Sequence, residues 1–142
     1  MLAAAAASFA TMLVLDIPWV TLNTRYGLYK GKVNGIVTNR AAVGAIWVAI
    51  LIMNSLLVGY IASTASKWWA ATLACAFCGL AVYATFNGTS VVLFDSWPAA
   101  TALGDTAWGA VLFAAAGTAA YFAASAAATT RAAGGSEGEE KT

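Results

Sequence analysis

Four long runs of apolar residues, separated by short polar stretches, dominate the chain. They cover about residues 3–22, 41–63, 68–94 and 98–128, and each reaches the roughly 20 mainly apolar residues that a helix needs to cross a bilayer. The runs are much longer than the ~9–11 residues of a membrane barrel strand, and they show no alternation with a period of two. The pattern therefore predicts an all-α protein, a bundle of four transmembrane helices.

The connections between these runs define the domain organisation. Residues 23–40 form the one substantial loop, in which three glycines and an asparagine break the helical pattern. The other two connections are short, one at Lys67 and one at residues 95–98. After residue 128 the chain turns to Gly, Ser, Glu and Lys, a composition too polar to bury a core. We therefore expect a membrane domain over residues 1–128 and a disordered polar tail over 129–142.

Composition supports the membrane assignment and excludes some partners. The 142 residues are 61% hydrophobic and 9% charged, and no soluble domain could hide so much apolar surface. A net charge of +1 offers no basic field for nucleic acid. We expect a multi-pass integral membrane protein whose first partner is the lipid bilayer, with no nucleic-acid partner.

The distribution of basic residues predicts the orientation of the helices in the membrane. Four of them lie in or beside the first loop, and two lie on the opposite side of the predicted membrane. The first group is Arg25, Lys30, Lys32 and Arg40, and the second is Lys67 and Arg131. Because basic loops stay in the cytoplasm, we expect the N- and C-termini on the non-cytoplasmic side. The sequence does not specify which membrane hosts the protein.

This topology places scattered polar residues at one depth. Asp16 and Asp105 both lie roughly 9–11 Å from the inner surface at 1.5 Å of rise per residue. A carboxylate at bilayer depth costs at least ~2.5–3.5 kcal/mol, which makes each a candidate functional residue. Each acid is followed three residues later by a tryptophan, and the third helix adds polar groups at the same level. The predicted buried polar cluster, for a ligand, an ion or helix packing, is Asp16, Trp19, Tyr83, Thr85, Asn87, Ser90, Asp105 and Trp108.

Catalytic and metal chemistry find little support in the sequence. The chain has no histidine, so its Ser, Thr and Cys residues lack the usual base. Cys75 and Cys78 have redox spacing but lie in an apolar helix that disfavours thiolate, and two cysteines do not complete a zinc site. We assign no catalytic residue, metal or cofactor and expect a non-enzymatic protein.

Several motifs carry a resemblance to a known family. They are Leu15-Asp16-x-x-Trp19, residues 83–90, Trp97-Pro98 and Asp105-x-x-Trp108-Gly109. Together they resemble an uncharacterised, chiefly bacterial family of small four-helix predicted membrane proteins of unknown function, over most of residues 10–115. In the family pattern an aspartate stands where this chain has Asn87, and an asparagine where it has Ser90. The resemblance implies the fold and the place of the site, and it transfers no activity.

Three classes of function are compatible with these observations. The favoured one is a non-enzymatic structural or accessory subunit of a membrane assembly, since alanines at four-residue spacing on the fourth helix suit docking to other subunits or self-association. The alternative is an oligomeric transporter or a proton- or cation-conducting protein that uses the buried Asp/Asn/Tyr layer. The third is a lipid-modifying membrane enzyme.

Overall fold

Four long helices make up the computed structural model, which describes residues 1–28, 40–94 and 97–139, the side chains of 40–43 and 134–139 excepted. The helices are α1 (Leu2–Arg25), α2 (Arg40–Thr64), α3 (Trp68–Leu93) and α4 (Ala99–Glu139). Each contains a stretch long and apolar enough to span a membrane. The predicted all-α bundle of four candidate transmembrane helices is confirmed.

The helix ends agree with the predicted runs except at the C-terminus. There α4 continues through Glu139, past the predicted start of the tail at residue 129. The alanine-rich segment that precedes position 129 favours a helix, because alanine has the highest helix propensity, and the helix runs on from it through Ala132 and Ala133. Residues 140–142 lie outside the described residues, as do 29–39 of the first loop and 95–96 of the third.

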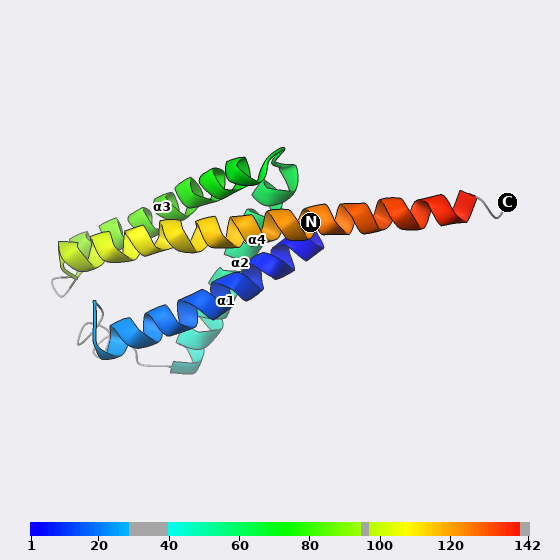
Figure 1. The fold of residues 1–142 in the computed structure, drawn as a ribbon. Coiled ribbons are helices and arrows are strands. Elements are labelled where there is room, and N and C mark those ends of the chain that lie inside the picture. The colour runs from blue at the N-terminus through cyan, green and yellow to red at the C-terminus, as the bar shows by residue number, and fades with distance from the viewer. Residues whose placement is uncertain (29–39, 95–96, 140–142) are drawn as a thin grey trace.

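Helix α4 is the centre of the bundle. It packs against each of the other three helices, whereas the described backbones of α1 and α3 do not contact each other. Figure 1 shows α4 running between α3 and α1, with its C-terminal part projecting beyond the bundle. Helix α2 contacts all three of the other helices, and in Figure 1 it crosses behind α1 and α4.

Close packing of α3 on α4 depends on glycine. A Cβ at Gly109 would collide with the ring of Tyr83, and one at Gly79 would collide with the Gly109 carbonyl oxygen. Farther along, a Cβ at Gly117 would lie 2.6 Å from the Cβ of Cys75. Residues without side chains thus let the two helix backbones approach closely, as membrane helices commonly do. Cys75 is buried in this contact and forms no disulfide.

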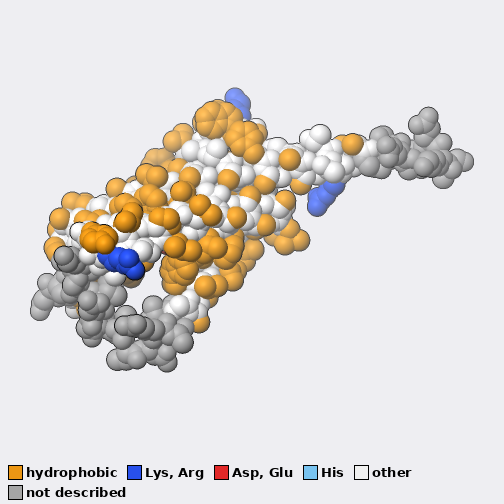
Figure 2. Space-filling model, turned by 60° about the horizontal axis from the view of Figure 1, so that its bottom comes forward, with side chains coloured by type: hydrophobic (Ala, Val, Ile, Leu, Met, Phe, Trp, Pro, Cys, Tyr) orange, Lys and Arg blue, Asp and Glu red, His pale blue; other side chains and the backbone are white. Residues whose placement is uncertain are grey.

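The outer surface of the bundle is apolar. Large hydrophobic side chains are exposed on all four helices, for example Val14, Met53, Phe77 and Val111. In Figure 2 hydrophobic side chains cover most of the described surface on the visible face, and basic side chains lie near helix ends. Such a surface suits a lipid environment, in which apolar exposure carries no penalty.

Candidate functional site

Asp16 links three helices through its carboxylate. The side chain is 4% exposed. Its Oδ1 accepts a hydrogen bond from Trp108 Nε1 of α4 at 3.1 Å, and its Oδ2 accepts one from Trp47 Nε1 of α2 at 3.2 Å. Each carboxylate oxygen therefore has an indole donor from a different helix, and α1, α2 and α4 meet at this residue.

Trp19 supports this arrangement by stacking instead of hydrogen bonding to the acid. Its ring lies parallel to that of Trp108, with centroids 4.4 Å apart and an interplanar angle of 6°. Spacing along α1 suggested that Trp19 would be the neighbour of Asp16, but the bonded indole comes from α4. The stack holds the Trp108 ring in the orientation that brings its N–H to the carboxylate.

A second set of hydrogen bonds centres on Asn87 of α3, which is 1% exposed. Its Nδ2 donates to Asp105 Oδ2 at 2.9 Å and to the Tyr83 carbonyl oxygen at 3.0 Å. Its Oδ1 accepts from Trp97 Nε1 at 3.0 Å. An indole can only donate and a carboxylate offers acceptors, so the two partners fix the amide orientation. An ionised aspartate here would lack the donor that reaches Asp105.

The remaining predicted residues lie in three different environments. The Tyr83 ring packs edge-on against Phe113, with centroids 6.3 Å apart. Ser90 is buried, and its hydroxyl donates to the Phe86 carbonyl oxygen at 2.9 Å. Thr85 is exposed and donates only within its own helix, to the Ala81 carbonyl oxygen. Two residues along a helix turn the chain by about 200°, so Thr85 points away from the face that carries Tyr83 and lies outside the cluster.

Sequence reasoning missed two members of these networks, Trp47 and Trp97. Trp97 stands in the turn before α4, where a tryptophan is usually an interfacial anchor. Trp47 has only apolar neighbours in the adjacent turns of α2, so nothing local marks it as a carboxylate ligand. Only the rotation of α2 against α1 brings its N–H to Asp16.

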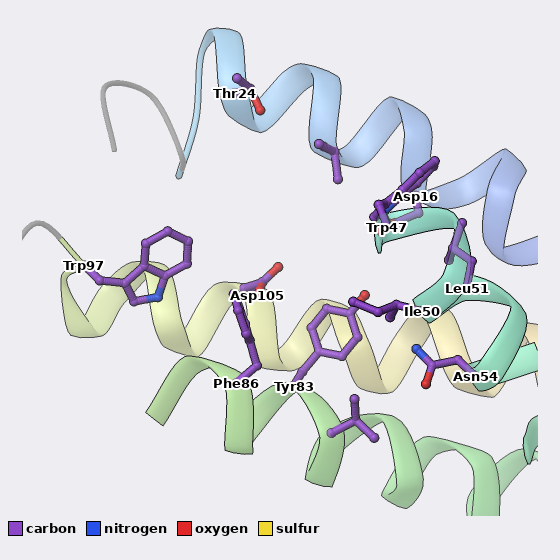
Figure 3. A pocket seen from close by; sticks show the side chains of 12 residues that line it. Asp16, Thr24, Trp47, Ile50, Leu51, Asn54, Tyr83, Phe86, Trp97 and Asp105 are labelled. Atoms are coloured by element: carbon purple, nitrogen blue, oxygen red, sulfur yellow. The ribbon is translucent and has the colours of Figure 1, made fainter. Parts of the chain in front are cut away.

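A pocket of about 410 Å³ lies beside both networks, within the size range of small-ligand sites. It takes residues from all four helices and the turn before α4. The lining residues are Asp16, Val20, Thr24, Trp47, Ile50, Leu51, Asn54, Val82, Tyr83, Phe86, Trp97 and Asp105. Figure 3 shows Asp105 and Tyr83 pointing from α4 and α3 into the space that faces α1. Both acids of the predicted cluster thus line a single cavity.

The described part of this site offers hydrogen-bonding groups and carboxyl groups. Its polar groups are carboxylates, indoles, an amide, a phenol and a threonine hydroxyl. Among the described residues, no group of three or more His, Cys, Asp or Glu could hold a metal ion. The described residues of the lining include no cysteine, serine or lysine, which are side chains that a neighbouring base can activate as nucleophiles.

Comparison with known proteins identifies the family of the chain and assigns it no function. No curated protein and no solved structure matches the chain. A family model described as "Predicted membrane protein (DUF2177)" matches residues 1–122, which include both hydrogen-bond networks and the whole pocket lining. This confirms the resemblance to a small membrane protein family of unknown function, and four apolar helices fit such a protein. The chain therefore belongs to the family of predicted membrane proteins called DUF2177.

Proposed function

We propose that the protein is a non-enzymatic structural or accessory subunit of a membrane assembly. One observation carries the proposal: the buried side chains of Asp16, Asn87 and Asp105 form hydrogen bonds between helices. Asp16 accepts bonds from two helices, and Asn87 joins α3 to α4 and to the turn before it. Interhelical hydrogen bonds of this kind fix the register of a membrane bundle.

The alternative function, proton or cation conduction, is favoured by the two carboxylates that line one pocket. Substitutions at Asp105 separate the two functions. Asp105→Asn retains an oxygen that can accept from Asn87, whereas Asp105→Leu leaves the Asn87 donor without this acceptor. A subunit therefore keeps its assembly in the Asn variant and loses it in the Leu variant. A conductor loses flux in both, because an amide does not ionise.

The test uses two measurements on the wild-type chain and both variants. Purification from the native membrane in mild detergent reports whether a second membrane protein accompanies the chain at constant ratio. Reconstitution into vesicles containing a pH-sensitive or cation-sensitive dye reports flux. We expect a constant ratio for wild type and Asn, a reduced ratio for Leu, and no flux above empty vesicles. Flux that depends on Asp105, or a chain that purifies alone, would contradict the proposal.

We also propose that the end of the bundle carrying the first loop faces the cytoplasm. Support comes from the basic residues of that loop. With Cys75 and Cys78 replaced, Lys32→Cys should react with an impermeant thiol reagent only after the membrane is opened. Ser136→Cys should react in sealed cells. Labelling on the reverse sides would invert the orientation and leave the networks in the opposite half of the membrane.

A further inference from the structure

The pocket between the four helices is elongated along the bundle. Figure 3 shows Thr24 and Trp97 at one end of the lining and Asn54 at the other. On α1 alone the lining extends from Asp16 to Thr24, which is about 12 Å at 1.5 Å of rise per residue. Thr24 is one residue from the end of α1, whereas Asn54 stands at the middle of the apolar span Gly44–Thr64 of α2. The pocket therefore extends from the end of the bundle that carries the first loop toward the centre of the membrane.

The carboxyl groups and the indoles of the lining bond to other parts of the protein. Asp16 accepts from two indoles, and Asp105 accepts from Asn87. Trp47 and Trp97 also line the pocket, and each donates its N–H within one of these two networks. What the two indoles present to the cavity is therefore ring surface, which is largely apolar.

Much of the remaining wall is hydrocarbon that stays open to the membrane. Val20 of α1, Ile50 of α2 and Phe86 of α3 line the pocket, and they are 40%, 48% and 57% exposed. Three helices thus each contribute an apolar residue that lines the cavity and also reaches the outer surface. An opening with such a rim faces the hydrocarbon chains of a bilayer.

A lipid has the shape and the polarity that this site requires. Next to Thr24, at the end of the pocket nearer the membrane surface, Arg25 is exposed and ends α1. A guanidinium at this level attracts the phosphate of a lipid head group. The cavity volume of about 410 Å³ is in the lower part of the range for small-ligand sites, which suits one hydrocarbon chain and not a whole lipid. We infer that the pocket holds one acyl chain of a phospholipid whose phosphate lies beside Arg25.

The inference goes beyond the proposed role as a subunit, because helices joined by hydrogen bonds to one another need no lipid between them. The bound chain passes Val20 and ends near the level of Asn54. The second acyl chain stays in the bilayer, outside the rim of the pocket. Binding of this kind forms and breaks no covalent bond.

The test titrates dioleoylphosphatidylglycerol onto the full chain in dodecyl maltoside, and native mass spectrometry counts the lipids retained per chain. Dioleoylglycerol has the same acyl chains and no phosphate, so it is the matched ligand control. We expect one phosphatidylglycerol per wild-type chain, with a lower Kd than that of dioleoylglycerol. Arg25→Gln removes one cation near the phosphate, so it should raise the Kd of phosphatidylglycerol about fivefold and leave that of dioleoylglycerol unchanged.

A second substitution tests the pocket itself. Val20→Trp places a large side chain in the cavity and should raise the Kd of both lipids about tenfold or more. Val14→Trp is the matched control, because Val14 is exposed on the same helix and does not line the pocket, so its Kd values should equal those of wild type. Far-UV circular dichroism checks that the variants are folded. If Val20→Trp is not, Val82→Trp on α3 replaces it, and if neither is, the wild-type and Arg25→Gln titrations decide.

Three results would each overturn the inference. The first is a wild-type chain that retains no phosphatidylglycerol at one per chain. The second is an equal Kd for the two lipids, or for phosphatidylglycerol with wild type and Arg25→Gln. The third is an equal effect of Val20→Trp and Val14→Trp in folded protein, which would place the lipid on the outer surface and not in the pocket.

Discussion

Replacing Asp16 by asparagine should destabilise the bundle, although the two side chains have nearly the same shape. Both carboxylate oxygens accept an indole N–H, one from Trp47 and one from Trp108. A carboxamide has one oxygen and an NH₂ group that can only donate. In Asp16→Asn one of the two indoles must therefore face a second donor, whichever way the amide turns.

The size of the effect follows from the donor that is left unsatisfied. A buried donor without an acceptor costs about 1–3 kcal/mol, so we expect Asp16→Asn to lower the free energy of unfolding by about 2 kcal/mol. Asp105→Asn should keep its hydrogen bond to Asn87, because the amide oxygen can still accept from the Asn87 amide. The two conservative substitutions should thus differ although both remove one carboxylate from the same pocket.

A double-mutant cycle attributes the cost to the orphaned indole. Trp47→Phe removes the N–H from α2 and keeps an aromatic ring, so it should destabilise wild type more than it destabilises Asp16→Asn. We expect an interaction energy of about 1 kcal/mol between the two positions, as for residues in direct contact. Additive effects of the two substitutions would show that the hydrogen bond to Trp47 contributes nothing.

The assay is reversible unfolding in mixed micelles of dodecyl maltoside and dodecyl sulfate, followed by far-UV circular dichroism. Circular dichroism is chosen because Trp47→Phe alters the tryptophan fluorescence directly. All variants must refold to the wild-type spectrum for the comparison to hold. If Asp16→Asn proves as stable as wild type, Asp16 does not need two acceptor oxygens and the reasoning fails.

Three further substitutions probe the packing of α3 on α4 and the hydrogen bonds around Asn87. Gly109→Ala should lower the free energy of unfolding by about 1–3 kcal/mol, because the added Cβ would meet the Tyr83 ring. Gly88→Ala is the control: its Cβ would lie in open space, so the change should be neutral or slightly stabilising. Thermal unfolding in detergent compares the two variants. Trp97→Phe should lower stability by about 1 kcal/mol by removing the donor to Asn87 Oδ1, and an unchanged unfolding midpoint in the mixed-micelle assay would contradict this.

The sequence was sufficient to predict the fold because each apolar run independently meets the length that a membrane requires. The positions of α1, α2 and α3 were predicted to within a few residues. The C-terminal end of α4 was harder to predict from the sequence. A loss of hydrophobicity marks where a helix leaves the membrane, and it does not mark where the helix ends. Alanine continues a helix in either environment.

The candidate site could be predicted less completely than the fold. Helical periodicity places Tyr83, Asn87 and Ser90 on one face of α3. Thr85 was included in the predicted cluster because of its depth, and the structure places it off that face. The predicted depth in the membrane placed Asp105 at the level of Asn87, and the two side chains form a hydrogen bond. Depth gives no rotation about a helix axis, however, so it could not identify which tryptophan bonds to Asp16. That choice depends on how α2 and α4 turn their side chains toward α1.

The central position of α4 makes assembly of the bundle depend on a helix that is synthesised after the other three. Before α4 is inserted, Asp16 has only its bond to Trp47, and Asn87 has no carboxylate acceptor. The first three helices also lack the surface that joins α3 to α1. A ribosome that stalls before residue 99 would therefore leave polar groups facing lipid. Insertion of α4 is the step that gives these groups their remaining partners.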